Sequence, residues 1–175
     1  MTELEKIKKL REITSLGIVD CKKALQESKG DFDSALNLLK KKGIEVIEKK
    51  KGRKTSQGLI DSYIHFGGNL GVLVEVNCET DFVARTDVFK SFVKDVAIQI
   101  AASNPKYVSR DDIPKEELTE VSDIDEYVKE NCLLEQVFVK DNSKTVGEYL
   151  REIVSQTGEN VVIKRFVRFS LDDAV

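Results

Sequence analysis

The fold of this chain is decided around the stretch Asn77-Cys78-Glu79-Thr80-Asp81-Phe82-Val83-Ala84. A valine-rich run with alternating apolar residues, 70–76, leads into it, and an amphipathic run, 88–102, follows it. These patterns predict a strand, a turn and a helix in that order. Loops held between regular elements often carry function. Phe82 in this turn either contacts a partner or folds back onto the core of its own domain.

The strand at 70–76 is predicted to have a partner just before it in the chain. From residue 58 the apolar residues alternate, with Ile60, Ile64 and Phe66 on one face. Gly67-Gly68-Asn69 is a turn signal between the two runs. Alternation on both sides of such a turn indicates a β-hairpin.

The rest of the chain adds helices and a returning strand. The helix at 88–102 is expected to cover a sheet and to end at Asn104-Pro105. Short helices are expected after Pro114 and near 124–130, and Thr145 with Glu148 fits a capping box at the start of another helix. Residues 161–169 read as the last strand. We therefore predict an α+β domain over 58–175, with helices packed on an antiparallel sheet.

The first 43 residues are predicted to form a separate module of three short helices. Thr14-Ser15-Leu16-Gly17 interrupts the first helical pattern, and the second stops near Gly30. Asp31 is suited to cap the third helix, because its carboxylate can accept hydrogen bonds from the free amides of the first turn. Gly43 is expected to end that helix.

A basic linker is predicted at 44–57, between the module and the core domain. It contains Lys49, Lys50, Lys51, Arg53 and Lys54. Such a run is a solvated, partly helical linker or, as the sharper alternative, a contact for RNA or for an acidic protein surface.

Composition indicates a globular protein with a heavily charged surface. The chain has 175 residues, of which 41% are hydrophobic and 34% charged, with a net charge of −3. An acidic balance argues against a surface that binds nucleic acid throughout. No apolar run approaches the roughly 18 residues of a membrane span, and the charged N-terminus shows no signal peptide. We expect a cytoplasmic protein that does not contact a membrane.

The sequence offers little for catalysis or metal binding. Cys21, Cys78 and Cys132 are far apart and form no Cys-x-x-Cys pair, so we expect reduced thiols and no zinc site. The single histidine, His65, lies in a predicted strand, and neither a phosphate-binding glycine loop nor a Ser-His-Asp set is present. We predict a binding or regulatory protein without a metal or cofactor, rather than an enzyme.

Three parts of the chain, in order, resemble the elongation factor Ts family. The N-terminal Leu10-Arg11-Glu12-Ile13-Thr14 with Asp20-Cys21-Lys22-Lys23-Ala24-Leu25 is similar to the family's first module. The central stretch at 74–84 is similar to its signature, and Ser143-Lys144-Thr145-Val146-Gly147 with Arg165-Phe166-Val167-Arg168-Phe169 resembles its C-terminal segments. The resemblance covers nearly the whole chain.

The resemblance implies a guanine-nucleotide exchange factor for elongation factor Tu, the GTPase that delivers aminoacyl-tRNA to bacterial ribosomes. In the family, a Thr-Asp-Phe-Val segment inserts into the GTPase domain and displaces groups that hold the magnesium ion of the nucleotide. The matching positions here are Thr80, Asp81, Phe82 and Val83. The partner would be bound both with GDP and without nucleotide, and no direct contact with nucleic acid is implied.

The resemblance also implies a role for the N-terminal module, which would be similar to a ubiquitin-associated domain and would dock on elongation factor Tu. The natural contact is the loop between its first two helices, with Leu16, Gly17, Ile18 and Val19. Longer family members have bulkier residues in place of Ile18 and Val19. The alternative is that Ile18 and Val19 belong to the core of the module.

Longer family members have a duplicated core and an inserted coiled-coil hairpin, whereas the resemblance implies one core unit for this chain. We therefore expect a two-fold homodimer through the core domain that binds two molecules of elongation factor Tu. A disulfide across the dimer is not favoured, since no cysteine lies near the C-terminus.

Two other functions compete with nucleotide exchange. A protein-binding adaptor could use the ubiquitin-associated-like module, but it would not explain the long α+β domain. An RNA-binding protein could use residues 49–54, but that run lacks interleaved aromatic residues and the chain as a whole is acidic.

Overall fold

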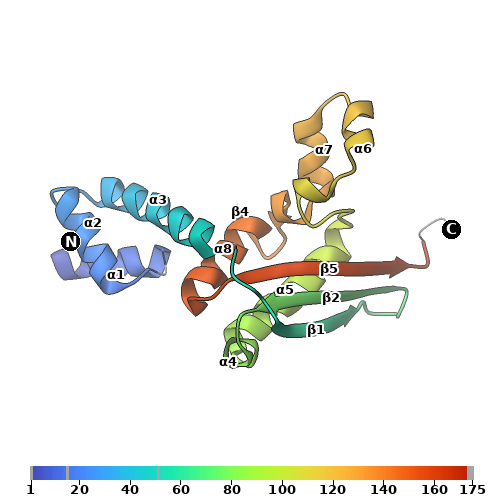
Figure 1. Ribbon diagram of the computed structural model, residues 1–175, viewed down its shortest axis with the longest axis horizontal. Coiled ribbons are helices and arrows are strands. Elements are labelled where there is room, and N and C mark those ends of the chain that lie inside the picture. Colours follow the sequence, from blue (N-terminus) through green and yellow to red (C-terminus); the bar gives the residue numbers. More distant parts are fainter. Residues whose placement is uncertain (1, 15, 51, 173–175) are drawn as a thin grey trace. The chain divides into compact units, whose positions relative to one another are not determined.

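A computed structural model describes residues 2–14, 16–50 and 52–172 of the chain (Figure 1). The chain divides into two compact units, Met1–Lys54 with Arg151–Asn160, and Thr55–Leu150 with Val161–Val175. Each unit is described by itself. The division into a module at 1–43, a linker at 44–57 and a core at 58–175 stays a prediction.

The first unit begins with three helices, α1 (Glu3–Thr14), α2 (Ile18–Glu27) and α3 (Phe32–Lys50). The Asp31 carboxylate accepts a hydrogen bond of 2.8 Å from the Ser34 amide, which confirms the predicted cap of α3. Apolar side chains at helical spacing form the core between these helices. The buried residues of this core are Ile7, Leu10, Leu16, Cys21, Ala24, Leu25, Ala35 and Leu39.

The expected end of α3 at Gly43 is wrong, because α3 continues to Lys50. Gly43 does not have the left-handed backbone that a glycine adopts just beyond a helix end, and strong helix formers surround it, among them Lys40, Lys41 and Glu45. One glycine inside a helix costs only about 1 kcal/mol, so these neighbours can carry the helix through it.

The second unit is built on a three-stranded antiparallel sheet in the order β1-β2-β5. β1 (Gln57–Ile64) and β2 (Leu70–Cys78) form the predicted hairpin, and β5 (Val161–Ser170) pairs with the other edge of β2. The ladder between β2 and β5 shifts register at Glu75/Val76, so Lys164 is an extra residue in β5. This shift is typical of a β-bulge.

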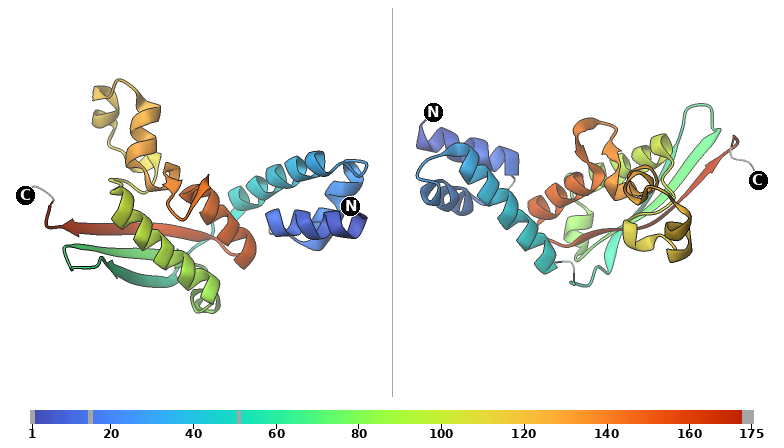
Figure 2. Two further views of the ribbon diagram at one scale, coloured as in Figure 1. Left: turned by 180° about the vertical axis from the view of Figure 1, so that it is seen from behind. Right: turned by 90° about the horizontal axis from the view of Figure 1, so that it is seen from above.

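One face of the sheet is covered by α5 (Asp87–Ser103), as Figure 2 shows from behind. α5 packs on β1 and β2. It buries an apolar stripe against inward-facing valines of β2, and the buried residues of this layer are Phe89, Phe92, Val93, Val96, Ala97, Ile100, Val72, Val74 and Val76. The structure therefore confirms the α+β class and the antiparallel sheet packed with helices.

The remaining elements follow α5 and precede β5. They are η1 (Arg110–Asp112), α6 (Lys115–Glu120), α7 (Ile124–Asn131), η2 (Leu133–Glu135), β3 (Val137–Phe138), β4 (Asp141–Thr145) and α8 (Val146–Thr157). Buried Gln99 of α5 holds the hairpin of β3 and β4. Its side chain donates to the Val137 carbonyl at 3.1 Å and accepts from the Val139 amide at 2.8 Å.

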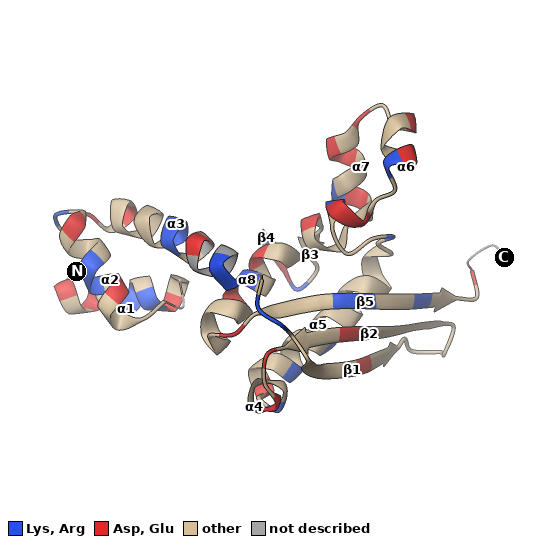
Figure 3. Ribbon diagram, in the orientation of Figure 1, with Lys and Arg blue, Asp and Glu red and all other residues tan. Residues whose placement is uncertain are grey.

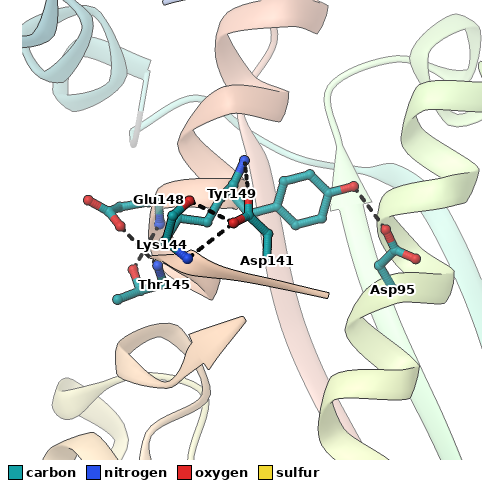
Figure 4. A network of polar contacts seen from close by, with 7 residues as sticks. Asp95, Asp141, Lys144, Thr145, Glu148 and Tyr149 are labelled. Atoms are coloured by element: carbon teal, nitrogen blue, oxygen red, sulfur yellow. Dashed lines mark hydrogen bonds and ion pairs between the residues drawn. The ribbon is translucent and has the colours of Figure 1, made fainter. Parts of the chain in front are cut away.

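The capping box predicted for α8 is present (Figure 4). The Thr145 amide donates to the Glu148 carboxylate at 2.9 Å, and the Glu148 amide donates to the Thr145 hydroxyl at 3.2 Å. In the same network the Tyr149 hydroxyl donates to Asp95 of α5 at 3.1 Å. α5 is thus tied by polar contacts to two later elements of the same unit.

Candidate partner-binding surfaces

The turn after β2 forms a one-turn helix, α4 (Asp81–Ala84), rather than an open loop. Thr80 caps it, with its hydroxyl oxygen accepting from the Val83 amide at 3.4 Å. Just before it, Cys78 is fully buried and its thiol donates to the Thr80 carbonyl at 3.1 Å. These contacts hold α4 firmly against the end of β2.

Phe82 points away from the core on this short helix. Its side chain is 80% exposed, whereas Ala84 in the same turn is buried. The alternative that Phe82 folds back into its own core is therefore wrong for this structure. Removing a Phe side chain from water yields roughly 1.5–3 kcal/mol, so a partner with a matching pocket would gain that much from Phe82 alone.

The other three residues of the Thr-Asp-Phe-Val segment differ from Phe82 in exposure and in contacts. Thr80, Asp81 and Val83 are half-buried. Asp81 forms an ion pair with Arg85, one turn later, at 2.9 Å. Thr80 and Val83 form the capping bond already described, so Phe82 is the side chain most available to a partner.

The candidate contact of the N-terminal module divides into one buried residue and three exposed ones. Leu16 belongs to the core of the three helices, and Gly17 takes an extended backbone as the N-cap of α2. Ile18 is 55% and Val19 is 66% exposed. The alternative that Ile18 and Val19 are core residues is wrong, whereas Leu16 is a core residue.

Sequence reasoning did not identify a third surface, the face of the sheet opposite α5. It turns toward the viewer in Figure 1 and carries large apolar side chains on all three strands, namely Ile60, Ile64, Leu73, Val167 and Phe169. The register places Leu73 opposite both Ser62 and Val167, and Gly71 opposite both Ile64 and Phe169. We call these five residues the open sheet face. The signal in the sequence is that the alternate positions of each strand that face away from α5 also include large apolar residues.

The structure shows where the candidate metal ligands, the histidine and the cysteines lie among the residues that it describes. No group of three or more potential metal ligands comes together there, and His65 is exposed beside Tyr63, with 3.0 Å between Nδ1 and the hydroxyl oxygen. Cys21, Cys78 and Cys132 are buried free thiols, and burial is the main cause that raises the pKa of Cys21 and Cys132. Among the helices described, none has the length and apolar character needed to cross a bilayer.

Comparison with known proteins decides the family. The model of the family "Elongation factor TS" matches residues 6–126 and 122–173. The chain belongs to the elongation factor Ts family. An elongation factor Ts of Thermoanaerobacter sp. is 46% identical over the whole chain and 97% of its own length. That of Methylacidiphilum infernorum is 50% identical over 97% of this chain and 94% of its own, and that of Thermotoga neapolitana is 42% identical over 97% of both. The chain is accordingly a translation elongation factor.

The alignment with the Thermoanaerobacter protein spans 198 positions, whereas this chain has 175 residues, a difference of 23. The two segments matched by the family model overlap at 122–126, from the connection after α6 into the first residues of α7.

Proposed function

We propose that this protein accelerates the release of GDP from elongation factor Tu by inserting Phe82 and its neighbours into the GTPase domain. The observation that supports this most directly is the 80% exposure of Phe82 on a capped helical turn that the core holds in place. A preformed turn loses little conformational entropy on binding, so the contact energy of Phe82 is available for the partner.

The proposed mechanism requires that the factor bind nucleotide-free elongation factor Tu more tightly than the GDP complex, because only differential affinity shifts an equilibrium. The coupling is reciprocal, so GDP weakens the factor as much as the factor weakens GDP. Displacing the groups that hold magnesium would expose the charge of the diphosphate. Burial of one Phe side chain corresponds to roughly one to two decades of affinity, and greater weakening would need the rest of the interface.

The direct test is the rate at which a fluorescent GDP analogue leaves elongation factor Tu of the same organism, with and without this protein. We expect the rate to rise with the concentration of the factor and to reach a plateau. An unchanged rate would contradict nucleotide exchange and would favour an adaptor that uses the N-terminal module.

We further propose that Gly17, Ile18 and Val19 form a second contact with elongation factor Tu. Two adjacent exposed β-branched side chains are costly to leave in water, and they stand at the start of α2 above a packed core. Leu16 would hold this contact in place from within rather than touch the partner. We place the protein in the cytoplasm, where elongation factor Tu works, with no direct contact with nucleic acid.

We also propose that two copies pair through the open sheet face and that the dimer binds two molecules of elongation factor Tu. The face is apolar across three strands, and a two-fold axis would bring the same residues of both copies together. The ion pair between Glu75 and Arg165, 2.7 Å long, lies on the same face in the row of Ile60 and would form a polar rim at that end.

Light scattering tests the dimer. The chain has a mass of 19.7 kDa, and we expect twice this value at micromolar concentration. Leu73→Glu should return the mass to that of one chain, because it would bury a charge between the two sheets. Val139→Glu is the matched control, since Val139 is similarly exposed but lies outside the face. A parent protein that has the mass of one chain would contradict the proposal.

A further inference from the structure

A groove runs along the outer edge of the sheet, beside β1. It has a volume of about 400 Å³ and is open to solvent. Three consecutive residues of β1 form one side and three residues from the first half of α5 form the other, namely Leu59, Ile60, Asp61, Lys90, Ser91 and Lys94. Of its residues, Ile60 also belongs to the open sheet face, and the other five have no part in the function proposed above.

The groove has an excess of positive charge on the α5 side. Lys90 and Lys94 lie one helical turn apart and are both exposed. Among the described residues neither ammonium group forms a hydrogen bond or an ion pair. The one carboxylate in the groove, that of Asp61, accepts a hydrogen bond of 2.8 Å from the Ser62 amide. An occupant with carboxylates would therefore meet two free cations.

The β1 side of the groove offers backbone groups to an extended chain. Among the strands that the structure describes, β1 pairs with β2 alone, so it is an edge strand. The His65 amide donates to the Leu70 carbonyl, and the register pairs Ile60 with Glu75 in the same ladder. Hydrogen-bonded and non-hydrogen-bonded pairs alternate along an antiparallel ladder, so the amide and carbonyl of Ile60 face outward, toward the groove. Free edges of this kind accept a further strand.

The two elements that form the groove also contact the turn of the proposed insertion site. α4 contacts β1, β2 and α5, so β1 and α5 hold the turn that carries Phe82 and also form the two sides of the groove. α5 begins at Asp87, and Lys90 lies in its first turn. Figure 3 marks the basic residues of the chain in blue, and α5 is among the elements that carry them.

We propose that this groove binds an extended acidic segment of elongation factor Tu, whose carboxylates contact Lys90 and Lys94 while its backbone pairs with β1 at Ile60. The proposal rests on the proposed exchange function. It assigns to the groove a contact that is mainly electrostatic and lies outside the insertion step, so its loss should weaken the encounter without slowing release once the complex has formed.

The test is a charge reversal, Lys90→Glu with Lys94→Glu, compared with Lys115→Glu with Lys129→Glu. The control lysines are exposed, change the net charge equally and lie in α6 and α7, outside the lining of the groove. The GDP release rate is measured against factor concentration at several salt concentrations. We expect the groove variant to need roughly ten times more factor for half-maximal rate, with the same plateau, and to lose most of the salt dependence of the parent.

The outcomes separate the two proposals. The groove proposal is overturned if the parent and the groove variant need the same factor concentration for half-maximal rate and show the same salt dependence. It is also overturned if the control pair raises that concentration as much as the groove variant does. A lower plateau at unchanged half-maximal concentration would also overturn it, because the lysines would then act in the insertion step. If the parent protein did not accelerate GDP release, the proposed exchange function would be wrong, and the groove proposal, which rests on it, would be wrong as well. Circular dichroism of each variant checks that its fold is retained.

Discussion

The Thr86 hydroxyl donates a hydrogen bond of 2.8 Å to the carbonyl of Val83. The same hydroxyl oxygen accepts from the Phe89 amide at 3.3 Å and so caps α5. One side chain therefore joins the turn that carries Phe82 to the long helix that covers the sheet. The position of Phe82 depends on this joint as well as on the cap at Thr80.

Thr86→Val should weaken nucleotide exchange although Phe82 is unchanged. The variant keeps the shape of the side chain but loses both hydrogen bonds, and loss of an N-cap costs about 1 kcal/mol of stability. A looser turn should lower the plateau rate of GDP release. Thr119→Val, in exposed α6, is the control, since its hydroxyl also donates to a backbone carbonyl, at 2.6 Å. Equal plateau rates for Thr86→Val and the parent would contradict this role.

The N-terminal contact is tested by two variants with opposite expectations. Ile18→Ala with Val19→Ala should raise the factor concentration needed for half-maximal GDP release while leaving the urea midpoint nearly unchanged, because both side chains are exposed. Leu16→Ala should lower the stability of the three helices by about 2–5 kcal/mol, because it opens a cavity in their core. If the double variant needs the same factor concentration as the parent for half-maximal GDP release, Ile18 and Val19 do not contact elongation factor Tu.

The α6 region should respond to pH through Glu117. Its carboxylate accepts 2.7 Å hydrogen bonds from the hydroxyls of Tyr127 and Tyr107, which lower the pKa of Glu117. The Glu117 contact raises the pKa of Tyr107 to about 12. The stabilisation by Glu117 is present above its ordinary pKa and is lost as pH falls through the lowered value. The stabilisation by Tyr107 is complete below the ordinary tyrosine pKa of about 10 and is lost as pH rises through about 12.

Ultraviolet absorbance of tyrosinate checks this prediction. In Glu117→Gln the ionisation of Tyr107 should move down from about 12 toward its ordinary value, because the charged acceptor is gone. Glu116→Gln is the control, as Glu116 is an exposed neighbour in the same helix. Identical titrations of the two variants would show that Glu117 does not control the pKa of Tyr107.

Much of the fold could be predicted from the sequence because its strongest signals are local. The hairpin at Gly67-Gly68-Asn69, the stripe of α5 and the caps at Asp31 and Thr145 each depend on residues close together in the chain. The hairpin of β3 and β4 was not predicted. β3 has two residues, β4 is polar throughout, and buried Gln99 from a distant helix holds their connection.

The candidate site could be located from the sequence, but the direction of its side chains could not. Whether Phe82 turns inward or outward depends on how α4 packs against β1, β2 and α5, which are tertiary contacts. The same holds for Ile18 and Val19, whose apolar character fits a core as well as a surface. The length of α3 depends on the helix formers on both sides of Gly43, which outweigh the cost of that single glycine.

Stopped-flow release of a fluorescent GDP analogue from elongation factor Tu tests whether Phe82 drives GDP release. Phe82→Ala should lower the plateau rate by roughly 10- to 100-fold. Phe66→Ala, which also removes an exposed Phe, should leave the rate unchanged, since Phe66 is 96% exposed and lies beyond the end of β1. A Phe82→Ala protein that releases GDP as fast as the parent would contradict the account.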